Sequence, residues 1–396
     1  MKKKVLILLI SIVSMILSST AYGLEKDSKI EKVTDELILQ QLDSLDISEI
    51  EGLIDKMNND KLVSMPKIDI KSMIISFVKG EADFTVKSVL ASIVKRLFKE
   101  IVINSKLLSQ LMFISILCAI LNNLSNSFGN SVTGEIAFYG CYLIIVGIAI
   151  KSFIVAMNIG QVAIDNMVSF MQALIPVLLT LLIAVGSITA SAIFKPIIVA
   201  SIGITSTIIK DIIIPLILFT AVLSIINNFT SKIQISKLAT LLKQISIGLI
   251  GLILTSFLGV ISIQGVLASS VDGVTLRTAR FAMDRFIPIV GGFMSEAIDA
   301  VFGCSLLLKN AIGVVGLILI LMIISLPILK ILSLIFIYKI TAALIEPITD
   351  KKIVDCLNDM SSLLTVLCAT VVSVAIMFFI AVTAVVGAGN ITAMIR

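Results

Sequence analysis

The chain has 396 residues, of which 58% are hydrophobic and 14% are charged, and its mean hydropathy is +1.12. In a typical soluble domain about a quarter of all residues are charged, so this composition indicates that water is not the main solvent of the protein. The chain contains no His, and its net charge of +5 comes without a basic aromatic patch, so zinc chemistry and nucleic-acid binding are both disfavoured.

The N-terminus has the features of a cleavable secretory signal. Three lysines precede a short apolar stretch, and small and polar residues follow it. This pattern predicts a signal peptide over residues 1–23, with Gly23 before the cleaved bond and Leu24 after it. The alternative cleavage lies between Ala21 and Tyr22. The sequence after the signal is therefore expected outside the cytoplasm.

A hydrophilic region follows the signal, and we expect it to be helical. Residues 24–83 are predicted to form an extracytoplasmic helical region, in which Ser48 and Glu51 have the spacing of a capping box. Residues 84–105 place apolar side chains three and four positions apart, with basic side chains on the opposite face. Such a helix before a span is typical of one that lies in the membrane interface, and the alternative is a helix packed on a partner protein.

The remaining residues, 106–396, are predicted to form a multi-pass transmembrane domain. They contain six long runs without Asp, Glu, Lys or Arg, and each can cross the bilayer core of about 30 Å as a helix. These runs cover residues 107–134, 166–194, 212–231, 244–271, 310–329 and 360–395. The predicted fold class is all-α: a polytopic helical membrane protein with a small helical extracytoplasmic region at its N-terminus.

The transmembrane domain is predicted to contain a parallel repeat of about 110 residues. Residues 116–125 resemble residues 221–230, and the segments around Pro176 and Pro288 match in the same order. In the first unit the predicted spans cover about residues 107–125 and 136–158. With the N-terminal region outside, the lysine-bearing loops within the later units are expected in the cytoplasm.

The repeat leaves the number of spans open between six and ten. Six spans result if the segments between the units are re-entrant. Ten result if each of these segments crosses the membrane twice, and in that arrangement Lys195 and Lys309 mark inner turns.

Two acidic residues form a candidate intramembrane polar site. Glu296 and Asp299 lie one helical turn apart in an apolar stretch that follows Pro288. Ionisable residues in spans are costly and often functional, and Pro- or Gly-broken helices in matching repeats build the sites of many secondary transporters. The alternative is that these carboxylates mark a helix end or face another subunit.

No catalytic, cofactor-binding or metal-binding residue is predicted. The sequence lacks the HExxH, GxSxG and P-loop patterns. The cysteines lack the CxxC spacing of metal and redox sites, so we expect them to be small buried apolar residues. They are Cys118, Cys141, Cys304, Cys356 and Cys368.

Several segments resemble the stage III sporulation protein AE family. The likeness is carried by FVKGEADF at residues 77–84, FKEIVINSKLLSQL at 98–111 and LCAILNNL at 117–124, with TARF at 278–281 and FIP at 286–288. It covers nearly the whole chain, including the signal peptide and the acidic region after it.

The resemblance implies a place and a role. The protein would lie in the mother-cell membrane that surrounds the engulfed forespore, with its N-terminal region between the two membranes. It would be the membrane subunit of a multi-protein channel or secretion-like complex that connects mother cell and forespore and is required for late forespore development. Its partners would be other membrane proteins of the sporulation apparatus and the lipid bilayer, without nucleic acid or cofactors. The alternative function is an autonomous secondary transporter, or permease, with a site near the Pro- and Gly-broken helices.

Overall fold

The computed structural model describes residues 37–59, 69–80, 86–127, 131–229, 235–286 and 291–394, and within them every regular element is a helix. The chain divides into two compact units, Met1–Ser44 and Leu45–Arg396. In the first unit the described residues, 37–44, form one helical segment. The predicted signal peptide and its cleavage residues Gly23, Leu24, Ala21 and Tyr22 lie outside the described residues.

The second unit begins with the short helices α3 (Ser48–Asn59) and α4 (Ile70–Val78). The capping box predicted at Ser48 is not used at the start of α3. The carboxylate of Asp46 instead accepts hydrogen bonds from the hydroxyl of Ser48 and from its backbone N–H, the latter at 3.2 Å. These two bonds lower the pKa of Asp46, because they favour its charged form. Asp69 caps α4 by the same chemistry, since its side chain accepts from the backbone N–H of Ser72.

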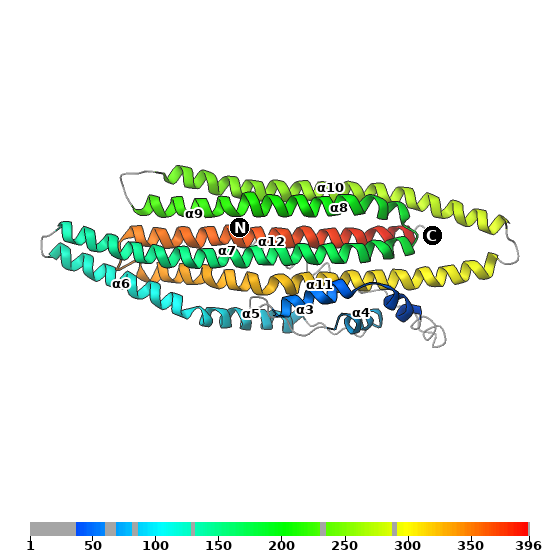
Figure 1. The fold of residues 1–396 in the computed structure, drawn as a ribbon, viewed down its shortest axis with the longest axis horizontal. Coiled ribbons are helices and arrows are strands. Elements are labelled where there is room, and N and C mark those ends of the chain that lie inside the picture. Colours follow the sequence, from blue (N-terminus) through cyan, green and yellow to red (C-terminus); the bar gives the residue numbers. More distant parts are fainter. Residues whose placement is uncertain are drawn as a thin grey trace. The chain divides into compact units, whose positions relative to one another are not determined.

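The membrane domain consists of long helices that lie side by side (Figure 1). They are α5 (Val86–Ile103), α6 (Ser105–Ser127), α7 (Ser131–Ala184), α8 (Ile188–Ile208), the π-helical turn η1 (Ile209–Ile213), α9 (Ile214–Phe229), α10 (Ser236–Phe286), α11 (Gly291–Ile345) and α12 (Lys351–Met394). Five of the described helical segments are long and apolar enough to cross a membrane, or six if the bent pair α5–α6 counts as one. The prediction of a polytopic all-α membrane protein is confirmed. The internal repeat and the number of bilayer crossings stay predictions.

Three helical hairpins of the bundle meet at one end, which we call the connection end. Tyr139 near the start of α7 and Phe229 at the end of α9 have ring centroids 5.0 Å apart. Thr349, between α11 and α12, donates a hydrogen bond of 3.3 Å to the carbonyl of Ser115 on α6. The hairpins α6–α7, α9–α10 and α11–α12 therefore turn at the same side of the bundle (Figure 1).

The opposite side, the far end, holds the turn from α7 to α8. Gly186 has a φ of 84° there, a left-handed conformation that glycine adopts without steric cost. The sequence reading ended the span before this turn at about residue 158, whereas α7 continues without a break to Ala184. Likewise α8, η1 and α9 form one candidate span over Ile188–Phe229.

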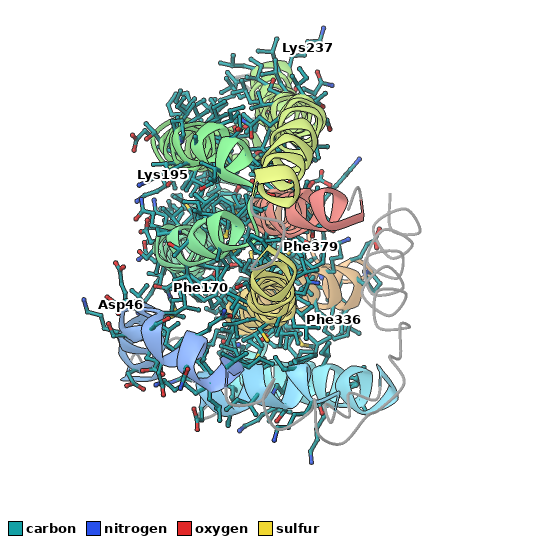
Figure 2. The ribbon with its side chains drawn as sticks, turned by 90° about the vertical axis from the view of Figure 1, so that its right-hand side faces the viewer. Asp46, Phe170, Lys195, Lys237, Phe336 and Phe379 are labelled. Carbon is teal, nitrogen blue, oxygen red and sulfur yellow. The ribbon has the colours of Figure 1, made fainter. Side chains whose placement is uncertain are left out.

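Helix α12 lies in the middle of the bundle and packs against α7, α9, α10 and α11. Figure 2 shows Phe170 and Phe379 among the helices, whereas Lys195 and Lys237 point outward. Close approach is permitted by glycines on α11. A Cβ atom at Gly313 would overlap the side chain of Val386 on α12, and one at Gly316 would lie 2.6 Å from Leu174 Cδ2 on α7. Small residues at helix contacts allow this approach in membrane proteins.

Candidate functional site

An ion pair joins two of the long apolar helices. The ammonium of Lys210 on η1 lies 2.5 Å from a carboxylate oxygen of Asp165 on α7. Their side chains are 36% and 48% exposed, respectively, so the pair is open on one side rather than sealed in the core. Placing a charged residue within an apolar membrane helix costs free energy, so such residues are functional candidates by default.

The local sequence explains why η1 departs from α-helical geometry. Pro215 has no backbone N–H, so it cannot donate the α-helical bond to the carbonyl four residues before it. Just before Pro215, the N–H of Ile214 bonds to the carbonyl of Ile209, five residues back. This wider turn carries Lys210 and places it against α7. Single π-turns within α-helices occur frequently at functional sites.

A lysine is buried inside the bundle, unlike the open pair. Lys309 on α11 is 0% exposed and donates a hydrogen bond of 2.8 Å to the carbonyl of Val386 on α12. The ten-span arrangement placed Lys195 and Lys309 at inner turns, and both placements are wrong. Lys195 lies inside α8 and Lys309 inside α11, so neither marks a turn.

Polar side chains also join helices near the connection end. Asn228 on α9 donates a 2.9 Å hydrogen bond to the Asp359 carboxylate on α12. Lys243 on α10 is hydrogen-bonded to Ser362 on α12. These contacts fix α12 between α9 and α10, which is a structural role rather than a ligand site.

The predicted polar site stays a prediction. Glu296 and Asp299 fall on α11, at positions whose side chains lie outside the described part of the structure. All five cysteines are free and buried, as expected for small apolar residues. Among the described residues no three His, Cys, Asp or Glu side chains gather as a metal site would require.

Sequence reasoning missed the Asp165–Lys210 pair. It began a span at residue 212, which turned Lys210 into a flanking residue. The available signal was that Lys210 and Asp211 are the only charges between residues 196 and 231. Its partner could not be read from the sequence, because Asp165 lies 45 positions away along the chain.

Comparison with known proteins places this architecture in a family. A sequence model for the family described as Stage III sporulation protein AE matches residues 68–389. The chain is 38% identical over 326 residues to the Bacillus subtilis (strain 168) protein named Stage III sporulation protein AE, and the match covers 82% of each of the two chains. No solved structure matches the chain.

Proposed function

Because the chain belongs to the stage III sporulation protein AE family, we propose that it is a membrane subunit of a multi-protein channel or secretion-like complex between mother cell and forespore. The observation that carries the proposal is the extent of the match, which runs from the end of the predicted extracytoplasmic region to the last described helix. In this proposal the protein lies in the mother-cell membrane and has no enzymatic activity.

The proposed orientation places the N-terminal region between the two membranes. It is supported by the signal-like sequence of residues 1–23 and by the lysines near the connection end, such as Lys237, Lys243 and Lys352. Cytoplasmic loops carry an excess of Lys and Arg, so the connection end is assigned to the cytoplasm. The partners in the proposal are other membrane proteins of the sporulation apparatus.

The Asp165–Lys210 pair also favours a subunit of a larger assembly. An open ion pair on the side of an apolar bundle is better matched by water or a polar partner than by lipid, because unsolvated charges are costly in hydrocarbon. A subunit of a larger assembly provides such surroundings.

Reconstitution separates this function from the alternative of an autonomous transporter. We expect liposomes that contain only the purified protein to show no substrate-selective flux above empty liposomes, while deletion of the gene in its endospore-forming host blocks late forespore development. Selective flux from the purified chain, lost in the Glu296→Gln, Asp299→Asn double variant, would instead establish the transporter. A deletion strain that forms spores normally would contradict both the channel role and its requirement.

A further inference from the structure

We propose that the bilayer surrounds only the half of the bundle next to the connection end, and that the far half projects as a helical column into the extracytoplasmic space. The interaction surface is a lipid belt made by exposed apolar residues of α6, α7, α9 and α11. It includes Phe113, Leu143, Val155, Phe219 and Phe336. A smaller set is exposed outside the belt, on α8, at Ile188, Val199 and Ile204. The extent of the belt is independent of the proposed function, whereas the side assigned to the column rests on the orientation proposed there.

The helices are too long for one bilayer. The apolar segments of α7 and α11 contain 47 and 46 residues. At about 1.5 Å per residue each spans roughly 70 Å, against a hydrocarbon core of about 30 Å. A tilt of about 40°, the upper end for membrane helices, still leaves roughly 54 Å along the membrane normal. A large part of each helix therefore lies outside the hydrocarbon core.

The outer face of α7 changes character at one position along the helix. From Ile136 to Val155 its exposed large side chains are apolar with the exception of Lys151, over a length of about 29 Å at 1.5 Å per residue. From residue 156 to the end of α7 the exposed positions are Asn158, Gln172, Pro176 and Thr180, followed by Ile183 and Ala184. The first stretch matches the thickness of a bilayer core, and the second is a surface suited to water.

The apolar sequence of α11 in the far half does not contradict this division. Val301 and Leu307 are exposed, but no position from 308 to 331 is. Helices α4, α5, α7 and α12 pack against α11, so the protein itself covers its apolar side chains. A helix that is apolar all round is buried, either in lipid or in the interior of a protein.

Charged helices from the N-terminal region rest on the bundle. Helix α3 packs against α7 and exposes Glu49, Asp55 and Lys56. These charges are too costly for a hydrocarbon environment. The part of the bundle that carries α3 therefore lies in water, and Figure 1 places α3 and α4 away from the connection end.

Helix α5 marks the boundary between the two halves. It meets α6 at an angle of 47° and exposes the apolar residues Val94, Phe98 and Val102 beside the exposed bases Lys95 and Lys99. A helix with this composition lies in the membrane interface. The Asp165–Lys210 pair lies beyond the belt, since Asp165 follows Val155 by ten positions on α7. On α7 the apolar stretch of the belt ends at Val155. Lys151 lies four positions before it, and its long side chain can extend the amine to the membrane interface.

Thiol labelling tests the belt. Single variants Asn158→Cys and Gln172→Cys report on the far half, Leu143→Cys on the belt and Ser236→Cys on the connection end. All four sites are exposed, and the five native cysteines are buried, so the parent chain is the background control. The variants are expressed in a heterologous bacterial host without the sporulation partners, and intact protoplasts are treated with a membrane-impermeant maleimide.

We expect Asn158→Cys and Gln172→Cys to be labelled from outside, Ser236→Cys only after permeabilisation, and Leu143→Cys in neither condition. Labelling of Leu143→Cys by a lipid-soluble maleimide shows that its thiol is present. The proposal is overturned if Asn158→Cys and Gln172→Cys react only with the lipid-soluble reagent, because the far half is then embedded. Labelling of these two variants only after permeabilisation would overturn the extracytoplasmic placement of the column, together with the orientation proposed above, and would leave the extent of the belt unchanged.

Discussion

Gly313→Leu should destabilise the membrane domain by roughly 1–3 kcal/mol, the range for an overpacked core. Gly313 faces Val386 on α12, where even a Cβ atom would overlap the valine side chain. Val386 is β-branched and stiff, and its carbonyl accepts the hydrogen bond from the buried Lys309. A larger side chain at 313 therefore has to push α11 and α12 apart at the point where the lysine is satisfied.

The measurement is the thermal midpoint of the purified protein in detergent, together with its abundance in membranes. Gly303→Leu is the matched control, since a Cβ at Gly303 on the same helix meets nothing within 4 Å. We expect that control to be neutral or slightly stabilising, because Gly is about 1 kcal/mol less favourable than Ala in a helix. Shortening the opposing side chain in Gly313→Leu, Val386→Ala should recover part of the loss. Equal midpoints for the Gly313 and Gly303 variants would show that α11 and α12 do not pack this closely.

Asp165→Lys should abolish late forespore development. The change puts two lysines together where the structure has an ion pair of 2.5 Å. Because both side chains are more than a third exposed, solvent screens the pair, and its loss should cost only about 0–1 kcal/mol of stability. The effect should therefore appear in function more than in abundance. Spore titre and membrane abundance are measured side by side.

The swapped variant Asp165→Lys, Lys210→Asp decides whether the pair itself matters. It restores opposite charges between η1 and α7, and we expect it to recover most of the spore titre. The control is Asp211→Lys, a reversal at an exposed residue of the same π-helical turn, which should leave the titre near the wild-type value. If the swap stays as defective as the single reversal, or the control is equally defective, the pair has no specific role.

The helical membrane class could be predicted because it depends on composition. Uncharged apolar runs of this length are typical of helices that cross a membrane. The resemblance to the sporulation family is confirmed. It could be recognised from the sequence because it rests on local segments such as residues 98–111. The predicted interfacial helix over residues 84–105 has its counterpart in α5. Its placement in a membrane stays a prediction.

The length of the helices could not be predicted, because span counting assumes segments of about 20 residues. Nothing in the sequence around residue 158 shows that α7 continues to Ala184. Lysines were misread for a related reason. The ten-span arrangement treats a lysine in an apolar region as the mark of a cytoplasmic turn, whereas Lys309 is buried and donates a hydrogen bond to a carbonyl of α12. Such a contact between distant segments is visible only in three dimensions.

The association of this chain with other membrane proteins of the sporulation apparatus is tested most directly by isolating it from sporulating cells. A C-terminally tagged chain, cross-linked in living cells before solubilisation and identified with its neighbours by mass spectrometry, should bring down a reproducible set of sporulation membrane proteins. A tagged membrane protein of similar abundance serves as the control for non-specific capture. Recovery of the chain alone, or with only the proteins that the control also captures, would contradict a role as a subunit.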